Sequence, residues 1–198
     1  MAIIVDKEKK RADIACSCKE LLLKSGFNSI TISKITKTAG ISKGSFYDYF
    51  ENKEDLVFEI LSHLMQDYNK KLKERIDNQN CTINKIKELK SFFYKDEYKE
   101  LRSIYKQFAA ISLIERDEHI AKFQRKNHQF YKDWLDTLIQ EGISKGELKQ
   151  EASLITEGLF AAIKGFYISF TVMNKESDLE KEIGIYLDNL FKLLKVNK

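Results

Sequence analysis

Apolar residues recur at spacings of three and four along nearly the whole chain, and the sequence holds no proline and only eight scattered glycines. This spacing is typical of amphipathic helices that bury one face. We therefore predict an all-α protein of about nine helices. Their expected ranges are about 7–24, 32–38, 43–49, 52–76, 82–95, 97–115, 117–141, 151–173 and 177–195.

Capping residues mark the ends of the first helices. Asp6, Thr31 and Ser42 each precede an expected helix and can accept hydrogen bonds from its first amides, whereas Gly26 and Gly40 follow one. Later helices are separated by polar or glycine-containing breaks, and there is no internal repeat or low-complexity tract. Three helices in fifty residues are thus followed by a larger helical part.

Two short helices, Thr31–Ala39 and Ser42–Tyr49, are joined by the tight turn Gly40-Ile41. Such a helix-turn-helix lets its second helix enter the major groove of DNA while the first crosses the backbone. An ordinary helical corner would show the same spacing, so the geometry alone leaves both interpretations open. Gly44 near the start of the second helix lowers helix propensity, which favours a close approach of another molecule there.

The net charge of +4 is confined to the N-terminal part of the chain. Residues 1–53 carry 10 Lys and Arg against 6 Asp and Glu, and the remainder carries 24 of each. A basic segment joined to a neutral one suggests that the first part meets a polyanion and the second has another task.

From Thr31 to Leu56 the sequence TISKITKTAGISKGSFYDYFENKEDL closely resembles the signature of the TetR family of bacterial transcriptional regulators. Ile14, Leu21, Leu22, Gly26 and Phe27 extend the match through the first helix. The resemblance implies a three-helix DNA-binding domain over 1–52 and a ligand-binding and dimerisation domain over 53–198. The sequence departs from the family pattern at Tyr49, where His is usual, and at Cys18, where Ala is usual.

Carried over by position, the resemblance implies DNA contacts from both helices of the motif and from the start of the next. Thr31 and the start of its helix would hold phosphate, Ser42 would cap the recognition helix, and the head of that helix would meet the DNA. The expected DNA-binding residues are Thr31, Ser42, Lys43, Gly44, Ser45, Tyr47, Tyr49 and Lys53.

The apolar faces of the helices expected at about 52–76, 97–115 and 117–141 are unusually rich in aromatic residues, and a few polar residues interrupt them. Such faces are usually core, but a mostly apolar cavity with a few orienting polar groups would have the same composition. The expected ligand-binding residues are His63, Tyr105, Phe108, Phe123, Asn127, Phe130 and Trp134, with Gln107 as a further polar candidate.

The last two helices predict a dimer interface. Small residues on one face of 151–173 let another helix approach closely, and the final helix adds more apolar surface than one helical pair hides. The alternative is that these faces close the monomer core. The expected interface residues are Gly158, Ala162, Gly165, Phe166, Ser169, Ile183, Leu187, Leu190 and Leu194.

Several other chemistries find no support in the sequence. Cys16 and Cys18 point about 200° apart on a helix and cannot share a metal, the three His lack ligand spacing, and no P-loop or nucleophile elbow is present. We expect no enzyme activity, metal or cofactor. Three Cys and the absence of a long apolar segment predict a cytoplasmic protein that neither spans a membrane nor is exported.

The function that we expect is that of a ligand-responsive transcriptional regulator. It would be a repressor that binds an inverted-repeat double-stranded operator as a homodimer and is released by a small apolar or amphipathic effector. The alternative is a helical ligand carrier or adaptor whose helix-turn-helix no longer regulates transcription.

Overall fold

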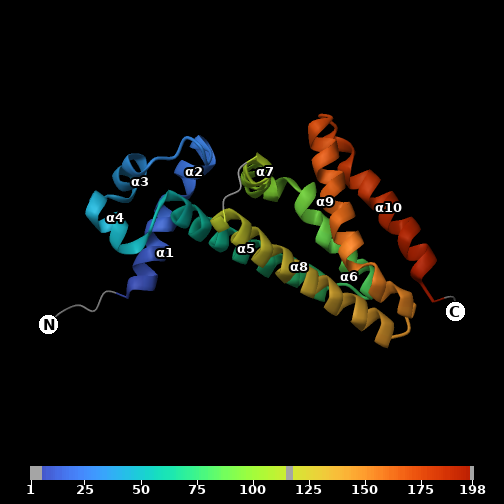
Figure 1. Ribbon diagram of the computed structural model, residues 1–198. Coiled ribbons are helices and arrows are strands. Elements are labelled where there is room, and N and C mark those ends of the chain that lie inside the picture. The colour runs from blue at the N-terminus through green and yellow to red at the C-terminus, as the bar shows by residue number, and fades with distance from the viewer. Residues whose placement is uncertain (1–5, 115–117, 197–198) are drawn as a thin grey trace. The chain divides into compact units, whose positions relative to one another are not determined.

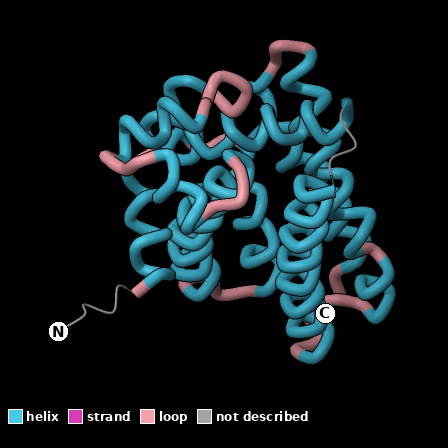
Figure 2. Tube along the Cα trace, turned by 60° about the vertical axis from the view of Figure 1, so that its left-hand side comes forward, coloured by secondary structure: helices cyan, strands magenta, loops and turns pink. Residues whose placement is uncertain are grey.

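The computed structural model describes residues 6–114 and 118–196, and within these ranges the protein is helical throughout, with one isolated antiparallel bridge between Leu148 and Lys195 (Figures 1 and 2). This confirms the predicted all-α class. The α-helices are α1 (Lys7–Ser17), α2 (Lys19–Ser25), α3 (Ile32–Ala39), α4 (Lys43–Tyr49), α5 (Lys53–Asp77), α6 (Thr82–Glu88), α7 (Lys99–Ile114), α8 (Glu118–Ser144), α9 (Thr156–Val172) and α10 (Leu179–Leu194). Short 3-10 helices are η1 (Leu89–Phe93), η2 (Asp96–Tyr98), η3 (Gln150–Leu154) and η4 (Glu176–Asp178).

The first expected helix is divided into α1 and α2 at Cys18. The Ser17 hydroxyl donates to the Ile14 carbonyl at 2.8 Å, and the Cys18 amide shares the carbonyls of Ile14 and Ala15. Cys18 consequently has φ −94° and ψ −1° and interrupts the regular ladder. Counted as one interrupted helix, α1 and α2 give the nine helices that the sequence predicts for the described ranges.

Tight 3-10 turns replace the ends of four expected helices. The segment expected over 82–95 is α6 followed by η1, and η2, η3 and η4 precede the regular parts of α7, α9 and α10. The junction expected at 115–117 lies outside the described residues.

The chain packs as two compact units, each with its own buried core. The first comprises Met1–Asp67 and Glu100–Phe123, and the second comprises Tyr68–Lys99 and Gln124–Lys198. This division describes packing alone, and the functional boundary expected between residues 52 and 53 stays a prediction.

The core of the first unit joins the helix-turn-helix to parts of α5 and α7. Ile14, Leu22 and Ile35 are at most 3% exposed, and Phe46 of α4 and its C-cap Phe50 add two large, buried side chains. On α7, Ile104 and Phe108 are buried as well. The recognition helix therefore has apolar support on its inner face.

The core of the second unit is built largely from α8, α9 and α10. Leu135, Leu159, Ile163 and Leu187 are at most 4% exposed, and α9 and α10 lie side by side in Figure 1. A 3-10 segment, η1, packs against α10. Across the described ranges, none of the helices combines the length and the apolar character that crossing a bilayer requires.

Candidate nucleic-acid interface

Side-chain caps fix the ends of the two helices of the motif. The Thr31 hydroxyl oxygen accepts from the Lys34 amide at 3.3 Å, and the Ser42 hydroxyl oxygen accepts from the Ser45 amide at 3.0 Å. Between the helices, Gly40 has φ 65°, a left-handed conformation that ends α3 at little steric cost. The caps expected from the sequence are therefore confirmed at both helices.

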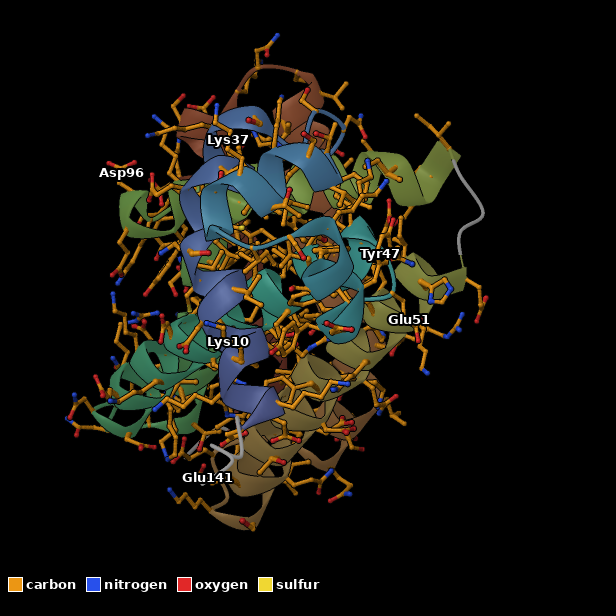
Figure 3. The ribbon with its side chains drawn as sticks, turned by 90° about the vertical axis from the view of Figure 1, so that its left-hand side faces the viewer. Lys10, Lys37, Tyr47, Glu51, Asp96 and Glu141 are labelled. Carbon is orange, nitrogen blue, oxygen red and sulfur yellow. The ribbon has the colours of Figure 1, made fainter. Side chains whose placement is uncertain are left out.

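Two phenylalanines anchor the recognition helix α4. Phe46 and Phe50 are at most 1% exposed, and their rings stack with centroids 5.5 Å apart. Their burial turns Lys43 and Tyr47 outward, and Tyr47 is 51% exposed on the helix in Figure 3. One face of this seven-residue helix is thus fixed while the other stays available.

Gly44 leaves an open surface at the head of α4. A Cβ placed there would meet only the Ser42 hydroxyl oxygen, at 3.7 Å, which is an ordinary contact. The fold of the isolated chain does not require glycine at this position. That glycine is needed here for the close approach of a bound molecule stays a prediction.

The expected contact residues around α4 differ in exposure. Thr31, Ser42, Lys43 and Gly44 are exposed, whereas Ser45, Tyr49 and Lys53 are partly buried. The Lys53 ammonium lies 5.1 Å from the centre of the Phe27 ring, and its side chain is 29% exposed. Lys53 therefore also packs on the core, a role that the sequence did not indicate.

Arg11 holds α1, α4 and the start of α5 together. Its guanidinium donates to Asp55 at 2.6 and 3.1 Å, to Glu59 at 2.9 Å and to the backbone carbonyl of Tyr49, and it lies 4.5 Å from the centre of the Phe50 ring. The hydrogen bonds with Asp55 are the largest cause that raises the pKa of Arg11. Sequence reasoning missed this residue because its partners are 38 to 48 positions away.

Gln107 of α7 is bound to the backbone of the helix-turn-helix region. Its side-chain oxygen accepts from the Phe27 amide at 2.8 Å, and a Cβ on Gly26 would lie 2.8 Å from that oxygen. The sequence suggested Gln107 as a polar group of a ligand cavity. In the structure Gln107 instead satisfies the Phe27 N–H, which needs an acceptor because Phe27 is only 5% exposed.

The expected ligand-binding residues fall into both units. In the first, Phe108 and Phe123 have ring centroids 6.2 Å apart, and Phe58 stacks on Phe123 at 4.9 Å. Burial raises the pKa of Tyr105 to about 12, and the His63 Nε2 atom lies 3.3 Å from Glu59 without forming a hydrogen bond. Asn127, Phe130 and Trp134 belong to the second unit.

Phe130 and Trp134 line an open groove of about 580 Å³ between the end of α5 and α8. Their rings are 5.9 Å apart in an edge-to-face arrangement, and Phe130 is 48% exposed. The other lining residues are Asn69, Lys70, Lys73, Asp133 and Thr137. Asn127 is partly buried on α8 and is not part of this lining.

The expected dimer residues separate into exposed and buried groups. Gly158, Gly165 and Ser169 are exposed, and the partly buried members are Ala162, Phe166, Leu190 and Leu194. Ile183 and Leu187 are 0% exposed, because their face of α10 closes the core of the second unit. They have no free surface to offer a partner. The sequence did not single out Ile168, Val172 and Leu193, which are 42%, 77% and 70% exposed.

Comparison with known proteins agrees with this geometry. Residues 18–60 match the model of the bacterial regulatory proteins of the tetR family. The fatty acid metabolism regulator protein of Bacillus subtilis (strain 168) is 24% identical over 178 residues, which cover 87% of this chain and 89% of that protein.

Two solved structures share the fold over nearly their whole length. A TetR-family transcriptional regulator from Cytophaga hutchinsonii is 18% identical, with a TM-score of 0.78, 98% of this chain and 99% of that chain covered. The transcriptional regulator FadR from Bacillus subtilis, solved in complex with stearoyl-CoA, is 22% identical, with a TM-score of 0.65 and coverage of 90% and 96%.

The anchored helix-turn-helix and the larger helical part define a DNA-binding regulatory protein. Residues 18–60 carry the DNA-binding domain of the tetR family, and the relative and solved structures named above are transcriptional regulators. This similarity supports a ligand-responsive, DNA-binding regulator, and the rival interpretation as a carrier or adaptor finds no support among these relatives.

Proposed function

We propose that this regulator is a cytoplasmic repressor that binds an inverted-repeat operator as a homodimer and is released by a small amphipathic effector. The observation that carries the DNA-binding part is the orientation of α4. Phe46 and Phe50 fix its inner face while Lys43, Gly44 and Tyr47 stay exposed.

The two caps prepare the motif for phosphate and base contacts. The hydroxyls of Thr31 and Ser42 accept from backbone amides. The Thr31 hydroxyl keeps its own proton available for donation, whereas the Ser42 hydroxyl also lies 3.0 Å from the Ser45 hydroxyl, and either of these two can be the donor. The Lys43 ammonium and the Tyr47 hydroxyl suit phosphate oxygens or base edges. Ser45, Tyr49 and Lys53, which are less exposed, would support the rim of this interface.

An exposed stripe on α9 supports the homodimer. Gly158, Ala161, Gly165, Ile168 and Val172 follow one another at spacings of three and four, and all five are exposed. The small residues allow a second helix to approach, and the last two contribute apolar area. A two-fold assembly through this stripe would give two recognition helices for two half-sites.

The effector acts through differential binding. A molecule that binds the arrangement unable to read DNA a hundredfold more tightly supplies about 2.7 kcal/mol of coupling, which weakens operator affinity a hundredfold. The relative solved with stearoyl-CoA suggests an acyl chain joined to a polar group as the type of molecule to try.

The decisive experiment measures binding to an operator selected from randomised duplexes. In fluorescence anisotropy, Lys43→Ala should weaken binding about tenfold and reduce the salt slope by about one, because one phosphate contact is lost. Lys181→Ala on α10 removes an equally exposed lysine and serves as the control. Equal affinity and slope for the wild type and Lys43→Ala would contradict the assignment of α4.

The dimer is tested separately by sedimentation. Val172→Glu places a charge on the exposed stripe and should yield monomers with unchanged helicity, whereas Glu180→Gln, elsewhere on the exposed surface, should leave the dimer intact. A wild-type protein that is monomeric at micromolar concentration would overturn the proposed assembly.

A further inference from the structure

Lys164 on α9 is a cation partly withdrawn from water. Its ammonium lies 4.7 Å from the centre of the Phe160 ring, one turn earlier on the same helix. The side chain is partly buried, and this loss of hydration is the largest cause that lowers the pKa of Lys164, against the opposing charge of Glu157. A cation in this position is costly unless an anion accompanies it.

The nearest carboxylate on α9 is engaged elsewhere. Glu157 lies two turns before Lys164, and its Oε1 atom is 3.1 Å from the Nε2 atom of His128 on α8. Within residues 6–114 and 118–196, Lys164 has no hydrogen bond or ion pair with an acidic side chain. The face of the Phe160 ring and the more distant charge of Glu157 compensate its charge only in part, since burial still lowers the pKa of Lys164.

The surroundings of Lys164 are otherwise aromatic. Phe160 contacts His128 at 5.1 Å and stacks against Tyr131 at 6.4 Å, both on α8. The Tyr131 hydroxyl donates to Asn69 at 2.8 Å, which fixes that ring. We call these four residues, Lys164, Phe160, His128 and Tyr131, the Lys164 cluster. It combines an apolar wall with one positive charge that no carboxylate contacts directly.

This combination has a definite preference among ligands. An acidic group beside the ammonium would restore its lost electrostatic stabilisation, and an attached apolar body would cover the rings. A quaternary ammonium would meet a ring face that Lys164 already occupies and would be repelled by its charge. A neutral alcohol would gain the apolar contacts alone.

We propose that Lys164 is the anion-recognising residue of the effector site and that the effector is an acidic amphiphile, with a carboxylate or phosphate joined to an apolar body. This inference rests on the proposed release of DNA by an effector and names its chemical class. The acid can come from a free fatty acid or from the phosphates of an acyl thioester, and these two sources are separated experimentally.

The test uses four probes on the full-length protein bound to its selected operator: dodecanoate, stearoyl-CoA, dodecanol and dodecyltrimethylammonium. Binding is followed by Trp134 fluorescence and release by DNA anisotropy. The acidic probes should bind the protein at least about tenfold more tightly than the neutral and cationic probes, as a charge-assisted hydrogen bond allows, and should release DNA at correspondingly lower concentrations. A response to dodecanoate alone, or to stearoyl-CoA alone, identifies the source of the acid.

Variants locate the effect at Lys164. Lys164→Met should weaken binding of the acidic probe about tenfold to a hundredfold and leave dodecanol unchanged, while Lys164→Arg should retain most of the affinity. Lys181→Met is the matched control, since its lysine is exposed on α10. Circular dichroism and DNA affinity without probes verify that the variants fold.

The possible failures are distinguishable. If dodecanol or the cation releases DNA as well as the acids do, effector release stands and the inference about Lys164 is overturned. If no probe binds and binding to the selected operator is insensitive to cell metabolites, the proposed effector response itself fails. If Lys164→Met shifts the sedimentation equilibrium without probes, a partner carboxylate neutralises Lys164 and the proposal is wrong.

Discussion

The helix-turn-helix region and the second unit each hold a well-partnered arginine but differ in the surroundings of one lysine, Lys43 in the first and Lys164 in the second. Around the DNA-reading helix, Arg11 is surrounded by carboxylates and a carbonyl, whereas Lys43 is exposed to solvent. In the second unit, Arg75 is likewise surrounded, donating to Tyr98, Ser91 and Glu88. Lys164 fits neither group, because it is partly buried and lies over a ring with no carboxylate in direct contact.

The difference follows from how the two kinds of ligand reach the protein. DNA brings its phosphates to an exposed surface, so a hydrated lysine such as Lys43 can meet them without a preformed partner. A small molecule needs a recess that is already partly dry, and a charge kept there recognises an opposite charge strongly. Arg11 and Arg75, whose donors are bound by neighbouring groups, hold the helices of the two regions in place. Each of the following substitutions tests one side of this comparison.

The largest effect is expected for Arg11→Met. Asp55 and Glu59 would keep their charges at 29% and 26% side-chain exposure without their cation. We expect the free energy of unfolding to fall by about 2 to 4 kcal/mol, measured by urea denaturation, since breaking a partly buried ion pair leaves uncompensated charge. Lys10→Met, at an exposed position of α1, should change it by less than about 0.5 kcal/mol. Similar stabilities for the two variants would show that Arg11 is not a structural hub.

A somewhat smaller effect is expected for Gln107→Leu. The buried Phe27 amide would lose its acceptor, at a cost of about 1 to 3 kcal/mol, and its hydrogen exchange should accelerate. Gln107→Glu keeps an oxygen acceptor and should lose less. Because Phe27 immediately precedes the helix-turn-helix, operator affinity should fall with Gln107→Leu as well. Unchanged exchange at Phe27 would show that this hydrogen bond contributes little.

Local features of the helix-turn-helix could be predicted from the sequence, because they depend on neighbouring residues. Asp6, Thr31 and Ser42 cap the helices they were expected to cap, and Asn52 accepts from the Asp55 amide at 2.8 Å. The interruption at Cys18 was missed, since it arises from one serine hydroxyl that competes for a backbone carbonyl. Helical periodicity does not report such a competition.

Long-range features could not be predicted. The hydrogen bond between Gln107 and Phe27 joins residues 80 positions apart, and the pattern around Gln107 indicated only a polar group on an apolar face. Periodicity likewise marks a face of α10 as apolar without saying what covers it, so Ile183 and Leu187 in the core look like interface residues. The sequence around Lys164 did not indicate its role, because a pattern of residues does not show that a lysine lacks a direct contact with a carboxylate.

A modest effect on two properties is expected for Lys53→Met, which tests whether a residue of the reading domain can have both roles. Loss of the contact with the Phe27 ring should lower the free energy of unfolding by about 0.5 to 1 kcal/mol. Operator affinity should also fall, and the salt slope should decrease by about one if Lys53 clamps a phosphate. Lys43→Ala, by contrast, should alter DNA binding alone. A salt slope equal to that of the wild type would assign Lys53 to packing only.

The smallest effect concerns Glu141 of α8, labelled in Figure 3, whose Oε1 atom accepts from both Lys145 and Lys85. Hydrogen bonds from Lys145 and then Lys85 lower the pKa of Glu141 below its ordinary value of 4.5. A carboxyl group with a lowered pKa stabilises the fold fully above that value and ceases to do so as the pH falls through its folded pKa. Glu141→Gln should therefore cost about 0.5 to 1 kcal/mol at pH 7, a value typical of partly exposed pairs, and the deficit should shrink as the pH falls below 4.5. Glu151→Gln, at an exposed position of η3, should show no such deficit when both are followed by urea denaturation from pH 7 to pH 3. A deficit that stays constant across this range would mean that Glu141 acts through packing rather than charge. Glu141 would then stabilise the protein by a different mechanism from Arg11, which acts through its charged hydrogen bonds.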